Sequence, residues 1–102
     1  MKYLYKIRSF RPYHSWIYIG EVNGSDLWEE EPFVHFIYCL QAMYNGEIKD
    51  IGEGRYKITG DPNHFVYQWD DLFGIVIETQ KKADPEGIKA LVQSLIDKVN
   101  EM

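Results

Sequence analysis

The chain has 102 residues, of which 45% are hydrophobic and 26% are charged, and its formal net charge is −5. This length and composition predict one small globular domain spanning residues 1–102 and argue against a disordered chain. The acidic balance argues against general nucleic-acid affinity, which rests on neutralised phosphates, and no apolar run approaches the roughly 20 residues of a membrane span.

The first part of the chain predicts two antiparallel strands. Residues 2–10 alternate between apolar and polar side chains, which is the period of a strand with one face in water. One face would carry Tyr3, Tyr5, Ile7 and Ser9. The other would carry the basic stripe of Lys2, Lys6 and Arg8, which together with Phe10 leaves RNA contact open as an alternative. Pro12 is expected to end this strand, and residues 15–22 predict a second, more central one.

Residues 33–44 predict an amphipathic helix. Apolar side chains recur at helical spacing on one face, namely Phe33, Phe36, Ile37, Leu40 and Tyr44. Pro32 suits the first turn of this helix, and Asn-Gly at 45–46 supplies a stop. Upstream, Asn-Gly at 23–24 favours a tight turn, with an optional short strand around 25–28. The aromatic and β-branched content of 33–44 keeps a strand open as the alternative.

The chain after this helix predicts further strands. Gly52 and Gly54 punctuate two short runs that indicate a hairpin, and Gly-Asp-Pro-Asn at 60–63 has the side chains of a turn. Residues 65–69 and 73–79 predict two more strands, the second of them central in the sheet because it is continuously apolar.

A helix near the end of the chain completes the predicted fold. Asp84 suits its N-cap and Pro85 its first position. Its apolar stripe would be Ile88, Leu91, Val92, Leu95, Val99 and Met102. The fold class that follows is α+β, an antiparallel sheet of four to five strands with two helices on one face, in the order β-β-(β)-α-β-β-β-α.

Two clusters combine acidic and aromatic side chains. One is Trp69, Asp70 and Asp71, and the other is Trp28 with Glu29, Glu30 and Glu31. Adjacent carboxylates on an extended segment point to opposite faces, so Asp70 and Asp71 do not make an acid–base pair by themselves. Each cluster also has a structural interpretation, as turn residues or as charges at a helix N-terminus. The mixture itself is typical of contact with a basic protein.

His35 and Cys39 are spaced to share one flank of the predicted helix. A Cys–His pair in a pocket would suit a small hydrolase, with His64 as a further candidate, and burial in the core is the structural interpretation. A three-histidine set with His14 would require a coincidence of the fold, so we expect no metal and no cofactor. With a single cysteine and no apolar signal segment, we expect a cytoplasmic protein.

The sequence therefore favours an acidic, non-enzymatic binding protein that engages a basic protein partner, in the manner of small acidic inhibitors. Trp69, Asp70 and Asp71 would make the primary contacts, supported by Trp28 and the three glutamates that follow it. Two alternatives stay open: a small hydrolase or ligand-binding enzyme that uses His35 and Cys39, and a homodimer that joins the basic first strand of one copy to the acidic 21–31 segment of another.

Overall fold

A computed structural model describes residues 3–14, 17–23, 30–70, 74–80 and 85–102. In chain order the elements are β1 (Lys6–His14), β2 (Ile17–Asn23), α1 (Glu31–Tyr44), β3 (Ile48–Gly52), β4 (Arg55–Ile58), β5 (Val66–Asp70), β6 (Gly74–Gln80) and α2 (Pro85–Asn100). The predicted α+β class is confirmed. The optional strand at 25–28 and the N-cap at Asp84 lie outside the described residues.

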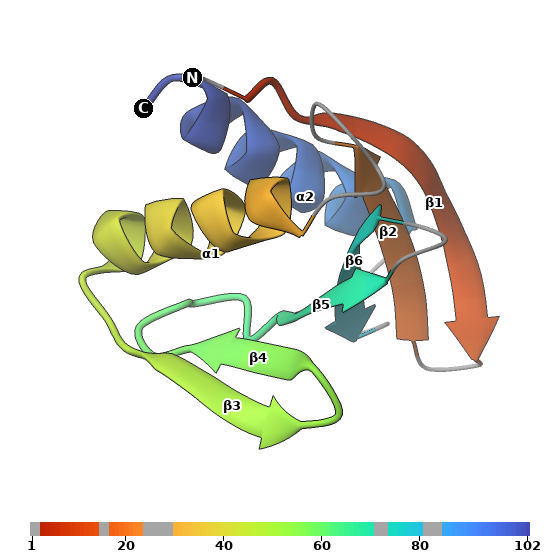
Figure 1. Cartoon of the computed structure of the whole chain (residues 1–102). Coiled ribbons are helices and arrows are strands. Elements are labelled where there is room, and N and C mark those ends of the chain that lie inside the picture. Colours follow the sequence, from red (N-terminus) through yellow and green to blue (C-terminus); the bar gives the residue numbers. More distant parts are fainter. Residues whose placement is uncertain (1–2, 15–16, 24–29, 71–73, 81–84) are drawn as a thin grey trace.

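The described strands form one antiparallel sheet in the order β1-β2-β6-β5-β4-β3. It has six strands, one more than the upper end of the predicted range, because four strands lie between the two helices where the predicted order has three. The ladder from β4 to β5 is short and consists of Arg55 opposite Gln68 and Tyr56 opposite Tyr67. The sheet bends there, so that the β3–β4 hairpin runs crosswise to β1 and β2 (Figure 1).

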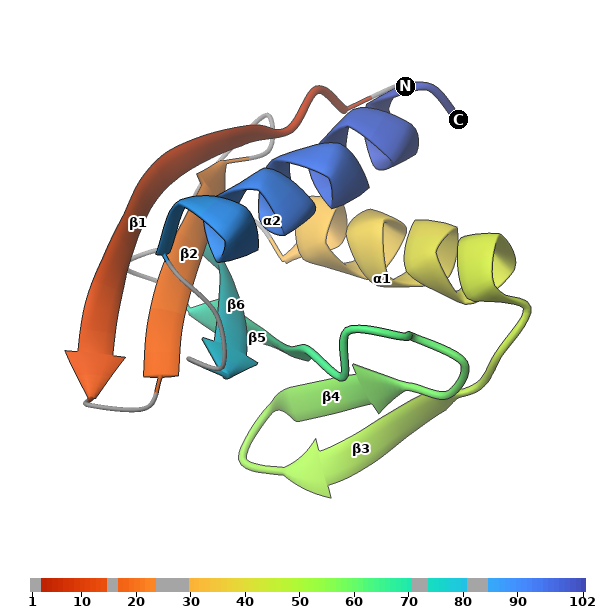
Figure 2. The ribbon, with the colours of Figure 1, turned by 180° about the vertical axis from the view of Figure 1, so that it is seen from behind.

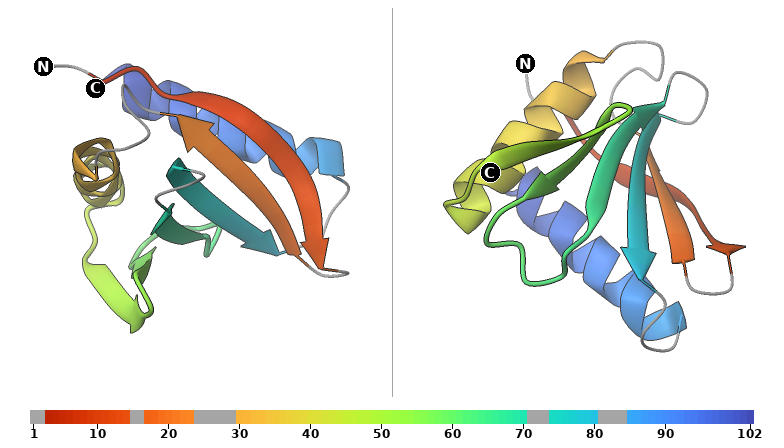
Figure 3. Two further views of the ribbon diagram at one scale, coloured as in Figure 1. Left: turned by 45° about the vertical axis from the view of Figure 1, so that its right-hand side comes forward. Right: turned by 90° about the horizontal axis from the view of Figure 1, so that it is seen from below.

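Both helices lie on the concave face of this bent sheet. α2 packs against β1 and β2, and α1 lies above β4 (Figures 1 and 3). One core joins them to the sheet, because alternate strand residues point inward. Its strand side includes Val22, Ile58, Tyr67, Ile75 and Ile77, and its helix side includes Phe33, Phe36, Ile37, Leu40, Val92, Leu95, Ile96 and Val99. The helices therefore share one face of the sheet, as the sequence predicts.

The first strand differs from its prediction in two details. It continues through Pro12, which β1 tolerates because it is an edge strand and needs no outward N–H donor. A register irregularity between Ile7 and Ser9 then changes the alternation, and Phe10 packs against the core. Phe10 is therefore not part of the exposed basic face, where Lys6 and Arg8 lie.

The helices also show where the apolar patterns hold. The strand alternative for 33–44 is wrong, since α1 is a helix with Pro32 in its first turn and Asn45 in the left-handed conformation at its end, φ 50°. The next position, Gly46, requires glycine because a Cβ there would collide with the Thr59 carbonyl oxygen. In α2, Leu91 is exposed and Ile96 is fully buried, since the stripe is centred on positions 92 and 96. Met102 is exposed beyond the helix end.

The start of the described chain is fastened to the end of α2. Asn100 accepts a hydrogen bond from the Tyr5 N–H through Oδ1 and donates one to the Tyr5 carbonyl through Nδ2, each at 2.9 Å. The side-chain amide thus pairs with this backbone as a neighbouring strand would. The start of the described chain consequently lies beside the end of α2 (Figure 2).

Candidate functional site

The structure describes part of each predicted acidic cluster. Glu30 and Glu31 are exposed at the start of α1, while Trp28, Glu29 and Asp71 lie outside the described residues. Trp69 is half-buried and packs against the core. Asp70, the next residue of β5, is directed to the opposite face of the sheet by the alternation of strand side chains.

The described residues of the two clusters lie at the same end of the molecule. β5 ends at Asp70, where it pairs with the start of β6, and the start of β6 in turn lies beside the end of β2. Tyr5, just before β1, donates a hydrogen bond of 2.7 Å to the Pro32 carbonyl and so fixes the start of α1 at this end. Figure 3 shows the same arrangement from below. Trp69 and Asp70 nevertheless point to different faces, so they do not form one continuous patch with Glu30.

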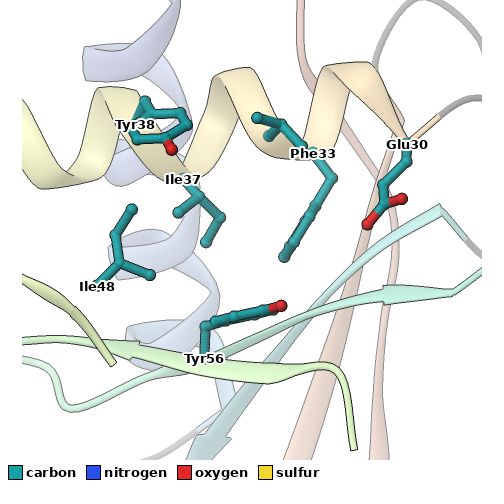
Figure 4. A pocket seen from close by; sticks show the side chains of 7 residues that line it. Glu30, Phe33, Ile37, Tyr38, Ile48 and Tyr56 are labelled. Atoms are coloured by element: carbon teal, nitrogen blue, oxygen red, sulfur yellow. The ribbon is translucent and has the colours of Figure 1, made fainter. Parts of the chain in front are cut away.

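A pocket of about 150 Å³ lies between α1 and the β3–β4 hairpin (Figure 4). It is lined by Glu30, Phe33, Val34, Ile37, Tyr38, Ile48 and Tyr56. An apolar cavity of roughly this volume accommodates a group the size of benzene. The pocket therefore has room for one large side chain.

Each wall of the pocket follows from local structure. On α1, Phe33 and Ile37 belong to the buried stripe, and Val34 and Tyr38 lie one residue further round the helix with 42% and 59% of their area exposed. On the hairpin, Tyr56 is opposite buried Tyr67, so its ring also faces α1. The Phe33 and Tyr56 ring centroids are 6.0 Å apart, which closes the floor between helix and sheet.

The charges around the pocket are acidic. Glu30 lies at one end with its carboxylate directed toward the space between helix and hairpin (Figure 4). Asp50 is opposite Tyr56 in the β3–β4 ladder, so it shares the face that looks toward α1. Lys49 and Lys57 form the neighbouring pair and are directed to the other face. Among the described lining residues there is no lysine or arginine, so the site favours a positively charged group.

Sequence reasoning found Glu30 but missed the other residues of this pocket. Val34 and Tyr38 offered a usable signal, because they form an i, i+4 pair of large apolar side chains outside the stripe that predicts the core face of the helix. The approach of β3 and β4 to α1 depends on the bend of the sheet. No local pattern in the sequence encodes that bend.

His35 and Cys39 do meet, on the opposite flank of α1, with 3.7 Å between Nε2 and Sγ. The Tyr5 hydroxyl donates its one proton to the Pro32 carbonyl and also lies 2.7 Å from His35 Nδ1. Nδ1–H then donates to the tyrosine oxygen, and the thiol sulfur lies almost as close to Nδ1, at 3.9 Å, as to Nε2, so the Nε2 lone pair does not point at it. Burial raises the pKa of the Cys39 thiol, the opposite of the change that activates a nucleophile.

We therefore expect Cys39 to be alkylated by iodoacetamide at pH 8 markedly more slowly in the native protein than in urea. The raised thiol pKa and partial burial lower both the thiolate fraction and its accessibility. Mass spectrometry of timed samples measures the two rates. A native rate equal to or above the unfolded rate would indicate an activated thiol and restore the hydrolase interpretation.

A second polar cluster is centred on Asp61, whose exposed area is only 3%. Its Oδ1 accepts from the Asn63 N–H at 2.9 Å, and its Oδ2 accepts from the Phe65 N–H at 3.2 Å and the Tyr67 hydroxyl at 2.9 Å. Burial and the nearby Asp61 charge raise the pKa of Tyr44 to about 12. These bonds are the local turn contacts that the sequence at 60–63 predicts, so this carboxylate organises the fold.

No three His, Cys, Asp or Glu side chains in the described part of the chain gather as a metal site. Neither described helix is long and apolar enough to cross a bilayer. Comparisons with protein-family models, with curated proteins and with solved structures found no match for this chain. The fold and the pocket thus define a small α+β domain with an acidic, aromatic pocket between α1 and the β3–β4 hairpin.

Proposed function

We propose that this protein is a non-enzymatic binding protein that engages a basic protein partner, and that the pocket between α1 and the β3–β4 hairpin receives a lysine or arginine side chain of that partner. One observation carries the proposal: apolar and aromatic walls enclose a space of about 150 Å³ with the Glu30 carboxylate at its end and no cation among its described lining residues.

Long basic side chains fit such a site because they have an apolar stem and a charged head. The stem would lie against Phe33, Ile37 and Ile48, and the head would reach the carboxylate of Glu30. The ring of Tyr38, at the other end of the pocket from Glu30, would cover the apolar stem (Figure 4). The net charge of −5 would attract a basic partner before contact.

The acidic residues at the same end of the molecule would form the rim of this interface. Glu31 adjoins the pocket residue Glu30 and is exposed. We propose an outer contact region for the same partner. It would consist of Asp70 together with the predicted contacts Trp28, Glu29, Trp69 and Asp71. Rim charges act mainly on the association rate and its salt dependence.

The alternative functions have less support. The hydrolase built on His35 and Cys39 requires a thiol that loses its proton readily, whereas burial raises the pKa of Cys39. The homodimer joins β1 of one copy to the 21–31 segment of another, most of which lies outside the described residues. Light scattering at micromolar concentration and low salt tests the homodimer. A monomeric protein under these conditions would exclude it.

Selection from a random-peptide phage library on the immobilised protein tests the proposal. We expect the selected peptides to be enriched in lysine or arginine and to lose roughly tenfold or more in affinity for Glu30→Gln, since a charge-assisted contact is worth about 1.5–3 kcal/mol. Tyr38→Ser should also weaken them, and Glu101→Gln, a change of an exposed residue beyond the end of α2 that does not line the pocket, should not.

Two results would contradict the proposal. One is a selected pool with no excess of basic residues. The other is a basic pool that binds Glu30→Gln and Glu101→Gln equally well, because general attraction to an acidic protein would then explain the enrichment. Affinities measured at two salt concentrations separate these cases, since a screened rim contact weakens with salt more than a partly buried one.

A further inference from the structure

We propose that the partner segment binds as an extended strand, antiparallel to β3, and that its alternate side chains enter the space between β3 and α1. We call this space, which includes the pocket described above, the groove. This inference rests on the proposed function and specifies how the same pocket is used. The occupant is an extended basic segment in which a basic residue precedes an apolar residue by two positions. Peptides add to exposed sheet edges in this way, with the main chain giving affinity and side-chain pockets giving specificity.

β3 is an edge strand of the described sheet, with β4 as its neighbour on one side. Figure 3 shows the hairpin below α1, with β3 on the side away from the rest of the sheet. Every described neighbouring pair in this sheet is antiparallel, so an added strand would continue the same pattern.

The hydrogen-bond alternation of the β3–β4 ladder shows which backbone groups face outward. Thr59 N–H donates to the Glu47 carbonyl at 2.9 Å, which marks this as a hydrogen-bonded pair, although the Glu47 N–H donates to Thr59 Oγ1 at 2.6 Å in place of the Thr59 carbonyl. In an antiparallel ladder such pairs alternate with pairs that are not hydrogen-bonded, which assigns the next hydrogen-bonded pair to Lys49. The N–H and C=O groups of Ile48 and Asp50 therefore point away from β4, toward the open edge.

The same two residues present their side chains to the groove. Ile48 lines the pocket, and Asp50 shares its face of the strand because the two are two positions apart. Residues of an added strand that bond to Ile48 and Asp50 would lie directly opposite them, on this face. An apolar residue opposite Ile48 would meet Tyr38, and a basic residue opposite Asp50 would meet its carboxylate.

The Asp50 carboxylate is held in position by its own turn. Its Oδ1 accepts a hydrogen bond of 2.8 Å from the Gly52 N–H. With Glu30 at the pocket, the groove face then carries two carboxylates, which complement a basic segment. The opposite face of β3 carries Lys49. Its charge would repel a basic residue at the position between the two side chains of the segment that face the groove, so the segment should be basic only at the groove-facing position.

The other described sheet edge does not fit the same occupant. β1 is the longer edge strand, with nine residues, but it exposes Lys6, Arg8 and Arg11. Edge lysines and arginines discourage strand addition in general and repel a basic segment in particular. We therefore assign the docking edge to β3.

A synthetic peptide with the proposed pattern, acetyl-Thr-Arg-Thr-Ile-Thr-Val-Thr-amide, tests the strand geometry by titration of the ¹⁵N-labelled protein. N-methylation of its arginine and isoleucine removes the N–H groups that would bond to β3, and N-methylation of the threonine between them leaves those groups intact. We expect the first change to weaken binding roughly tenfold or more and the second to weaken it little. Amide exchange at Ile48 and Asp50 should slow on binding.

A charge reversal checks the predicted contact with Asp50. Asp50→Lys should weaken the arginine peptide, and a peptide with glutamate in place of arginine should bind this variant better than it binds the wild type. Glu101→Lys makes the same charge change at an exposed residue that does not line the pocket and should not show this reversal. An arginine peptide that binds equally well with either N-methylation, without slower exchange at Ile48 and Asp50, would overturn strand addition and leave the proposed basic-partner function standing. An arginine peptide that does not bind the wild type at all would overturn strand addition, and the library selection alone then decides the proposed function.

Discussion

Replacement of Asp61 by alanine is expected to lower the free energy of unfolding by about 3 kcal/mol or more, because hydrogen bonds to a charged acceptor contribute about 1.5–3 kcal/mol each. Three donors converge on this carboxylate, which is 3% exposed. Alanine would leave the Phe65 N–H and the Tyr67 hydroxyl buried without their acceptor. Those two groups lie at the entry to β5, the strand that joins the hairpin to the rest of the sheet.

Urea unfolding followed by circular dichroism measures this effect. Asp97→Ala is the matched control, since Asp97 is exposed on α2 and accepts a single surface hydrogen bond from Gln93. The free energy of unfolding of Asp61→Asn should lie between those of the wild type and Asp61→Ala. The asparagine keeps one oxygen acceptor, but its amide group is a donor that faces other donors. A loss for Asp61→Ala no greater than that for Asp97→Ala would mean that Asp61 does not organise this turn.

The second large effect is expected in alkali, where the protein should lose stability steeply above about pH 10, the ordinary tyrosine pKa. Tyr5 and Tyr67 are 1% and 0% exposed, and burial raises the pKa of both hydroxyls above the ordinary value of 10.0. For Tyr67 the negative charge of Asp61 and its hydrogen bond raise the pKa further.

The sign follows from proton binding. Between the unfolded and the folded pKa, the unfolded chain has lost these protons and the native state retains them, so deprotonation favours unfolding. The contribution of each tyrosine is complete below pH 10 and decreases by about 1.4 kcal/mol per pH unit above it. Urea unfolding at successive pH values measures the slope.

Tyr67→Phe separates this linkage from general alkaline damage. The variant is less stable at neutral pH because Asp61 loses a donor, yet its stability should fall less steeply with pH by about 1.4 kcal/mol per unit. Tyr38→Phe, a change of an exposed ring, should leave the slope as in the wild type. Equal slopes in all three proteins would show that Tyr67 titrates normally in the native state.

The fold was largely accessible from the sequence because local signals agreed. Pro32 and the Asn45-Gly46 pair mark both ends of α1, and the turn residues around Asp61 make the local bonds that their chemistry predicts. The inward position of Phe10 depends on the register of β1. Phe10 turns inward after an irregularity in β1, and a one-residue slip in register reverses which face a side chain occupies.

The candidate site was accessible only in part. Glu30 was predicted as a contact residue from its acidic neighbours, but its pocket partners Ile48 and Tyr56 come from strands that reach α1 through the bend of the sheet. Distances between such segments depend on sheet curvature, which single-sequence patterns do not record. The predicted Trp69–Asp70 contact pair is divided between two faces of β5, and strand alternation would have shown this once β5 was extended to Asp70.

Recognition of a basic segment by the groove between α1 and the β3–β4 hairpin underlies both proposals. Its most direct test is the map of amide chemical shifts when the ¹⁵N-labelled protein is titrated with the basic peptides from the library. We expect the largest changes in residues 30–38 and 48–56, and we expect Glu30→Gln to reduce them. Changes centred on β1 or on the exposed side of α2, with the groove amides unmoved, would contradict it.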